Sequence, residues 1–295
     1  MFALIAKLVL AAIAVVLILL KLRKLPPAFM QGWFTAVLVC VVLLTGGTTF
    51  LIDMTRHLGV SKATTQIWCA IACKYIFGLL IQLNPQVRIR MDETRQKWDK
   101  IPNASAVICN HTSFLDAFVF TGYSPTSYIT NARTLMKDSL KKLPIFGGVF
   151  DRVGHFPVYF KSEEGGAFGV DPVKQAPVNE RVQTHLETGG RIALFPEGQV
   201  NKNPTTLMPF RNGTFSTIIK HKLPVYYVVM VGNDTVWPAS SSTGVGAPTT
   251  IDIAIGSIPI DHESESDPAA LSKKCQAAVQ KTLDEINAKR LKGGL

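Results

Sequence analysis

The sequence has 295 residues, of which 47% are apolar and 18% are charged, so it is too apolar for a disordered chain. Its 22 Gly and 17 Pro follow no period, which excludes collagen-like and low-complexity proteins. The net charge is +10. Residues 1–83 hold seven basic side chains and one acidic one, +6 by subtraction, so the other 212 residues hold the remaining +4. Positive charge between apolar runs favours a membrane surface as partner and argues against a nucleic-acid-binding protein.

Three apolar runs lie in the first 83 residues, at 2–20, 32–52 and 67–83. The first two are long enough to cross a hydrocarbon core of about 30 Å, whereas Lys74 interrupts the third. Basic residues follow the first run directly, at 21–24, which is typical of a signal anchor rather than a cleaved signal peptide. We therefore expect residues 1–83 to form a membrane-embedded helical region.

The number of membrane crossings decides where residues 84–295 lie. Basic residues prefer the cytoplasmic side, so three crossings, or a shallow re-entrant hairpin made by the first two runs, would leave this part in the cytoplasm. Two crossings would place it in the lumen. We expect the cytoplasmic arrangement, in an integral protein of the endoplasmic reticulum or another internal membrane. The five cysteines fit buried thiols in a reducing compartment better than disulfides or a metal site: Cys40, Cys69, Cys73, Cys109 and Cys275.

From residue 84 onward, short apolar runs alternate with helical patterns. The runs at 87–91, 104–109, 191–195, 225–231 and 250–255 predict strands, and those at 113–121, 134–140, 179–188 and 214–221 predict helices. Residues 162–178, dense in Gly and Pro, predict a surface loop. A final helix is expected after a cap at Asp267, with one apolar face made by Leu271, Cys275, Val279, Leu283 and Ile286. Residues 84–295 should thus form one α/β domain, with a mixed, mostly parallel sheet flanked by helices.

The first candidate for chemistry is the segment 110–116, which follows directly after an apolar run. It places His111 at the C-terminal end of a strand, where open α/β sheets tend to bind ligands. Asp116 would fall in the first turn of the next helix and could fix the tautomer of the His111 ring and stabilise its protonated form. The alternative is structural, because Ser113-x-x-Asp116 is also a capping box.

Two further segments carry polar residues beside predicted strands. Phe195-Pro196-Glu197-Gly198 ends another apolar run, and by itself could be an ordinary turn. Lys137 lies in a basic helical pattern that leads into Leu143-Pro144-Ile145-Phe146-Gly147.

Together and in this order, these segments resemble the glycerolipid acyltransferases, the family of 1-acylglycerol-3-phosphate acyltransferases. The Asn-His-x4-Asp motif of the family is matched by Asn110, His111 and Asp116. Its Phe-Pro-Glu-Gly motif is matched at 195–198, and its Lys-x-x-Leu-x-x-x-Pro-x-x-Gly stretch at 137–147. Residues 154–158 and 223–225 look like two further blocks, so the resemblance covers about residues 104–232.

The chain departs from the family pattern at two places. Phe160 stands where the second block often ends in Arg, and Gln199-Val200-Asn201 replaces the frequent Thr-Arg-Ser. The latter is closer to the tafazzin branch, whose members move acyl chains between phospholipids. Arg211 resembles the basic position of the family's third block and could supply the missing charge.

The resemblance implies transfer of a fatty acyl chain from acyl-CoA to a lysophospholipid hydroxyl, most directly 1-acylglycerol-3-phosphate. It implies His111 as general base, Asp116 as its partner, no acyl-enzyme, and acyl-CoA as a co-substrate with no metal or bound cofactor. Lys137, Glu197, Gly198 and Arg211 would bind the acceptor. The alternatives are a tafazzin-like transacylase, a lysophospholipid remodelling enzyme, or a non-catalytic membrane adaptor. Acyl-chain length, acceptor headgroup and oligomeric state are left open.

Overall fold

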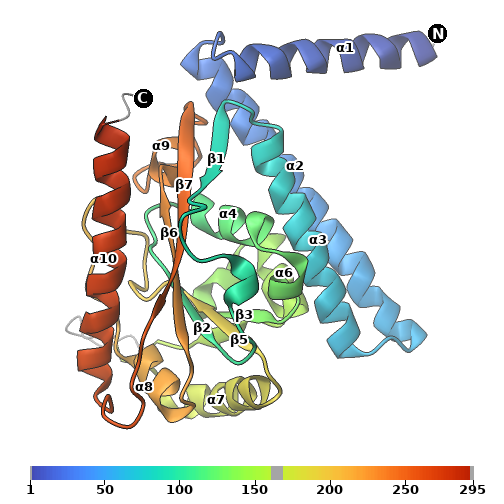
Figure 1. Ribbon diagram of the computed structural model, residues 1–295. Helices are drawn as coiled ribbons and strands as arrows, with labels where there is room; N and C mark the ends of the chain where they lie inside the picture. Colours follow the sequence, from blue (N-terminus) through green and yellow to red (C-terminus); the bar gives the residue numbers. More distant parts are fainter. Residues whose placement is uncertain (1, 161–168, 293–295) are drawn as a thin grey trace.

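The computed structural model describes residues 2–160 and 169–292 (Figure 1). Its centre is a seven-stranded sheet with the order β1-β7-β6-β2-β5-β3-β4. The five strands from β6 to β4 are parallel, β7 is antiparallel to β6, and β1 is parallel to β7. The strands are β1 (Val87–Met91), β2 (Ala106–Cys109), β3 (Ala132–Lys137), β4 (Phe156–Val158), β5 (Arg191–Leu194), β6 (Val225–Val231) and β7 (Thr249–Ile258). The predicted α/β fold with a mixed, mostly parallel sheet is confirmed.

Helices cover both faces of the sheet, which explains why its central strands are continuous apolar runs. One face packs against α2 (Pro27–Met54), α3 (Lys62–Gln82), α4 (Leu115–Tyr123) and α6 (Phe146–Val153). The other packs against α7 (Pro172–Glu187), α8 (Gly213–Lys220) and α10 (Pro268–Lys292). The short helices are α5 (Thr126–Ile129) and α9 (Asn233–Val236), with three 3-10 turns at Thr55–Leu58, Trp98–Lys100 and Asp138–Lys142. Alternate residues of β2 enter the two cores, with Val107 on the first face and Ile108 on the second.

The helices α2 and α3 form an antiparallel hairpin that is part of the first core. The Trp33 indole N–H donates to the Leu83 carbonyl at 2.7 Å, which joins the start of α2 to the end of α3. Phe34 meets Trp237 edge to face at 6.1 Å, and the side chains of Cys73 and Phe77 lie in the same cluster as the sheet residues. The core therefore runs across the predicted boundary between residues 83 and 84, which itself stays a prediction.

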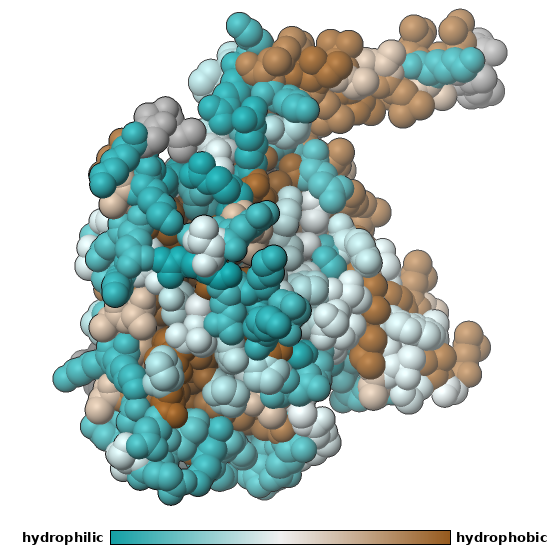
Figure 2. Space-filling view, viewed as in Figure 1, coloured by the Kyte–Doolittle hydropathy of each residue, from teal (hydrophilic) through white to brown (hydrophobic). Residues whose placement is uncertain are grey.

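The helix α1 (Phe2–Lys21) packs differently from the hairpin. Most of its apolar side chains between Leu4 and Ile18 are exposed, and it projects away from the sheet in Figure 1. Within the described residues, α1, α2 and α3 are each long and apolar enough to cross a membrane. Apolar residues cover α1 and the outer side of the hairpin in Figure 2. The hairpin is made by the second and third apolar runs, not by the first two.

Two of the predicted elements are wrong. The stretch 134–140 is not a helix: residues up to Lys137 belong to β3, and a 3-10 turn follows. Its Leu, Met and Lys residues favour helices, but the strand pairs with β5 through its first half and with β4 through its second, so tertiary pairing overrides propensity.

The second error is the loop expected at 162–178. Residues 161–168 lie outside the described part, but α7 begins at Pro172. The Asp171 carboxylate caps it by accepting from the Val173 and Lys174 amides at 3.1 and 3.2 Å. Pro177 lies inside this helix, where a proline normally interrupts the hydrogen bonding, and it concealed the helical pattern.

The last helix and the buried thiols follow the prediction more closely. The Asp267 carboxylate caps α10 through the Ala269 and Ala270 amides, and the five predicted face residues are buried. All five cysteines are free thiols and four are buried, whereas Cys40 is exposed on the outer face of α2. Burial raises the pKa of the Cys275 thiol to about 12, which keeps it protonated and unreactive.

Candidate active site

The candidate residues lie along one edge of the sheet, where its parallel strands end. His111 follows β2, Glu197 follows β5, Lys137 ends β3, and Phe160 follows β4. Because these four strands are adjacent and parallel, their carboxyl ends share one edge, with about 4.8 Å between neighbouring strands. Four segments that are far apart in the sequence thus meet at the edge where α/β sheets bind ligands.

His111 is paired with Asp116 through the side chains. The distance from His111 Nδ1 to Asp116 Oδ2 is 3.0 Å, and the Asp116 carboxylate is fully buried while the His111 ring is 17% exposed. A carboxylate only accepts, so Nδ1 carries the proton and Nε2 has the lone pair. The ring stacks on Phe195 at 4.2 Å. Across the described residues no protein group is hydrogen-bonded to Nε2, which leaves this nitrogen able to accept a proton.

The Asp116 carboxylate serves the helix as well as the histidine. Oδ2 also accepts from the Thr112 and Ser113 amides at 2.8 and 2.9 Å, and the Asn233 side-chain amide donates to Oδ1. The contact with the Ser113 amide is one half of a capping box, although the helix begins at Leu115 with Phe114 as its N-cap. Asp116 can therefore be both the partner of His111 and a cap of the helix, because one carboxylate has both sets of contacts.

Glu197 is buried and faces inward. Its Oε1 accepts from the His111 amide at 2.8 Å, and its Oε2 accepts from the Asn201 side chain at 2.8 Å and from the Met208 amide at 2.9 Å. The Asn201 amide donates to the His111 carbonyl at 2.6 Å, so the main chain of His111 is held from both sides. Burial raises the pKa of the Glu197 carboxyl, and these donors partly oppose the rise.

Gly198 provides the space through which Arg211 passes. Its φ of +72° is a left-handed conformation, and a Cβ at this position would lie 2.2 Å from Arg211 Nε. That nitrogen donates to the Glu197 carbonyl at 3.4 Å, and the guanidinium lies over the Phe160 ring at 5.5 Å. The aromatic residue at the departure from the family pattern thus contacts the arginine that we expected to replace the missing charge.

Lys137 opens onto a hollow of about 170 Å³ at the ends of β3 and β4. The hollow holds two ammonium groups, from Lys137 and Lys174, and one carboxylate, from Asp138. Its other lining residues are Ser139, Val158, Tyr159 and Phe160. Because Phe160 lines the hollow and also contacts Arg211, one ring connects the two. No motif or spacing in the sequence indicated that Lys174 would line this hollow.

Three asparagines support the site, and the sequence analysis assigned no supporting contact to Asn201 or Asn233. Asn110 exchanges two hydrogen bonds of 2.8 Å with the main chain of Met230, which fixes the end of β2 to β6. Asn233 reaches Asp116 from 117 residues away. No short-range pattern in the sequence could have shown such contacts. In the described ranges no group of three or more His, Cys, Asp or Glu side chains could hold a metal ion.

The sheet, most of the helices on its two faces and the His–Asp pair at its edge lie in or beside a segment that matches a known protein family. Residues 87–231 match the family described as Acyltransferase. The resemblance inferred from the motifs is confirmed.

The names of individual relatives are more specific than the family description. The chain is 25% identical over 144 residues to a 1-acyl-sn-glycerol-3-phosphate acyltransferase of Cocos nucifera, covering 49% of this chain and 42% of that protein. It is 26% identical over 155 residues to the protein of the same name from Neisseria gonorrhoeae, covering 51% and 54%. The chain thus spans about half the length of these relatives.

A solved structure shares the fold over nearly the whole chain. It is the 1-acyl-sn-glycerophosphate acyltransferase PlsC of Thermotoga maritima, with a TM-score of 0.66 and 16% identity, covering 91% of this chain and 98% of that one. The similarity therefore extends beyond the matched domain into the N-terminal helices.

Proposed function

We propose that the protein is a membrane-bound O-acyltransferase that moves a fatty acyl chain from acyl-CoA to the free hydroxyl of a lysophospholipid, first of all 1-acylglycerol-3-phosphate, giving phosphatidate. The observation that carries this proposal is the His111–Asp116 pair, with Nε2 available at the ligand-binding edge of the sheet. The names of the similar proteins support the choice of acceptor.

In the proposed reaction His111 is the general base. Nε2 takes the proton from the acceptor hydroxyl as its oxygen attacks the thioester carbonyl carbon, and Asp116 stabilises the imidazolium that forms. The tetrahedral intermediate collapses with loss of the CoA thiolate, which receives the proton from Nε2. No acyl-enzyme is needed. The nearby Ser113 hydroxyl is buried and donates to the Trp237 carbonyl at 2.6 Å, so it is already engaged.

The acceptor phosphate would lie near Lys137 and Arg211. Arginine offers a fork of donors to phosphate oxygens, and lysine a point charge. Glu197 would position His111 by accepting a hydrogen bond from its main-chain amide. Gly198 would leave room for the side chain of Arg211. These two residues would thus shape the acceptor site without contacting the phosphate.

The direct test is the purified full chain with radiolabelled acyl-CoA and a panel of lysophospholipids. We expect labelled diacyl product from 1-acylglycerol-3-phosphate, formed about 10²–10⁴-fold more slowly by a well-folded His111→Ala variant. Absence of transfer to every lysophospholipid would contradict the proposal.

A tafazzin-like transacylase or a remodelling enzyme is the second candidate. Two residues favour it. Asn201, which donates a hydrogen bond to Glu197, stands where the family often has Ser, and Phe160 stands where it often has Arg. Supplying radiolabelled phospholipid in place of acyl-CoA separates the two donors. A non-catalytic adaptor would transfer from neither.

We also propose that the hairpin lies along one face of the membrane and does not cross it. The globular part contacts α2 at both ends, through Trp237 at Phe34 and Arg152 at Phe50, which are about 24 Å apart along the helix. A crossing would therefore draw α4 and α6 into the bilayer. With α1 as the anchor, the domain would face the cytoplasm, where acyl-CoA is available.

Labelling of single introduced cysteines tests this arrangement. Cys40 is first replaced by Ser, because it is exposed whereas the other four native cysteines are buried. We expect Lys62→Cys at the hairpin turn and Lys281→Cys on α10 to react with an impermeant maleimide from the same side of sealed vesicles. Labelling from opposite sides would show that the hairpin crosses.

A further inference from the structure

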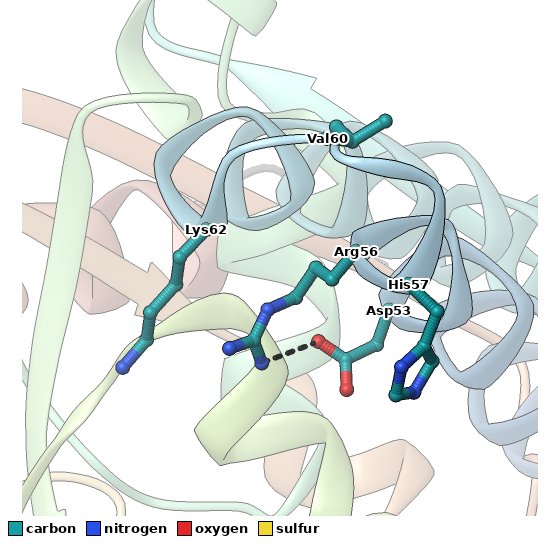
Figure 3. Close-up of a pocket in the computed structure, with 5 residues that line it drawn as sticks. All are labelled: Asp53, Arg56, His57, Val60 and Lys62. Atoms are coloured by element: carbon teal, nitrogen blue, oxygen red, sulfur yellow. Dashed lines mark hydrogen bonds and ion pairs between the residues drawn. The ribbon is translucent and has the colours of Figure 1, made fainter.

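The turn between α2 and α3 borders an open hollow of about 400 Å³, which shares no lining residue with the candidate active site. It is lined by Asp53, Arg56, His57, Val60 and Lys62. Figure 3 shows the polar ends of the four charged or ionisable side chains directed to one side, with Val60 directed away. We call these five residues the hairpin turn site.

The charge of the hairpin turn site is positive. Arg56 and Lys62 are cations, and Asp53 is the single carboxylate of the five. Asp53 Oδ1 lies 3.3 Å from Arg56 Nη1, which occupies one of the five N–H donors of the guanidinium. The two side chains are 37% and 46% exposed, so the ion pair is in contact with solvent. The site can therefore bind an anion without breaking the pair.

The same turn also carries exposed apolar side chains, within a few residues of Arg56 in the sequence. Leu51 is 65% exposed, Met54 48% and Leu58 84%. A free phosphate ion would gain nothing from such neighbours, whereas a phospholipid presents a phosphate and hydrocarbon chains side by side. Charged groups are costly in the hydrocarbon core, so a turn that carries them belongs at the level of the headgroups.

We infer that the hairpin turn site binds the phosphate of an anionic phospholipid headgroup. Arg56 and Lys62 donate to the phosphate oxygens, and the acyl chains lie along Leu51 and Leu58. Asp53 orients the guanidinium and, by its own charge, weakens the attraction. The inference rests on the proposed membrane attachment and is independent of the acyl transfer reaction.

Binding of dioctanoyl-phosphatidylglycerol to the full chain in an uncharged detergent, without acyl-CoA, tests the inference. Arg56→Gln/Lys62→Gln should weaken the apparent affinity about tenfold or more, as expected for lost charge-assisted hydrogen bonds. The matched control is Lys273→Gln/Lys281→Gln, which removes the same charge from the exposed surface of α10 and should leave the affinity unchanged. Asp53→Asn should tighten binding, a result that a damaged fold would not give.

Three results would overturn the inference: equal affinity in the Arg56→Gln/Lys62→Gln variant, equal weakening in the control, or displacement of the lipid by an equal concentration of inorganic phosphate. Transfer to a soluble short-chain acceptor in detergent should be the same in all these variants. That readout separates failure of the hairpin turn site from failure of the proposed reaction.

Discussion

Histidines lie at opposite edges of the parallel sheet, and their surroundings differ in one decisive respect. At the carboxyl edge, Nδ1 of His111 faces the Asp116 carboxylate, an acceptor. At the amino edge, just before β4, Nδ1 of His155 accepts from the Thr134 amide at 3.1 Å, a donor. The first partner puts the proton on Nδ1 and the lone pair on Nε2, and the second does the reverse.

The nearby charges strengthen the contrast. Desolvation, and then the Arg133 cation, lowers the pKa of His155 to about 3, so this ring stays neutral with its lone pair already used. His111 has the Asp116 carboxylate beside it in place of a cation, and its Nε2 is not engaged by any described group. A histidine in a family-like segment is thus a candidate base only if its other nitrogen has an acceptor.

The largest expected effect comes from removing the ring that can act as a base. His111→Ala should lower kcat by about 10²–10⁴-fold, since this is what a positioned base contributes. His155→Gln should retain the activity per folded molecule. Steady-state kinetics with circular dichroism as the check on folding would decide. A folded His111→Ala protein with normal turnover would reject the role of His111.

Replacing the Asp116 carboxylate, which only accepts hydrogen bonds, by an amide that can also donate tests whether the partner of His111 Nδ1 matters. Asp116→Asn should lower kcat by up to roughly 10⁴-fold, the effect of the same change in a Ser-His-Asp triad. It should also destabilise the fold by about 1–3 kcal/mol, because Asp116 Oδ2 in the unchanged chain accepts from two main-chain amides and from His111. If only stability fell and kcat per folded molecule held, the carboxylate would be a cap alone.

The acceptor side of the same edge should respond to charge geometry. Arg211→Ala should raise KM for 1-acylglycerol-3-phosphate roughly ten- to a hundredfold, with little change in KM for acyl-CoA. Arg211→Lys should recover only part of the loss, because lysine lacks the fork. An unchanged acceptor KM in Arg211→Ala would favour the tafazzin-like reading.

The smallest expected effect is a pH dependence of stability from His155. Its folded pKa of about 3 lies below the ordinary 6.5, so the stability it contributes is present above pH 6.5 and is lost as pH falls from 6.5 toward 3. The loss should be about 1.4 kcal/mol per pH unit in that range. Thermal unfolding at pH 7.0 and 5.5 should show a smaller drop for His155→Gln than for the unchanged chain. Parallel drops would place the titration elsewhere.

The sequence was sufficient for the elements whose pattern is local. Each of the five runs that predicted a strand contains one in the structure. The Asp267 cap and the regularly spaced apolar face that follows it correspond to α10. The His111–Asp116 contact was also foreseeable, because five residues across a strand–helix junction bring the side chains together. These features depend on residues within one or two turns of each other.

What could not be predicted depends on distant contacts. The helix-favouring residues of β3 form a strand only because β4 and β5 lie on either side of it. Phe156-Pro157-Val158 is too short to be recognised as a strand. Asn201 was only a departure from the family motif, and Asn233 an ordinary loop residue, until the fold placed Glu197 and Asp116 beside them. The packing of Arg211 on Phe160 likewise needed the fold.

The hairpin that shares its core with the sheet sets an order on biosynthesis. Phe34 leaves the ribosome about 200 residues before its partner Trp237, which at roughly 5–20 residues per second is about 10–40 s. During that interval the inner face of α2 and α3, including Cys73 and Phe77, has no sheet to cover it. In the proposed arrangement, the lipid surface that receives the outer face would also cover the inner one until β7 is made. The membrane would then act as a temporary chaperone for half of the core.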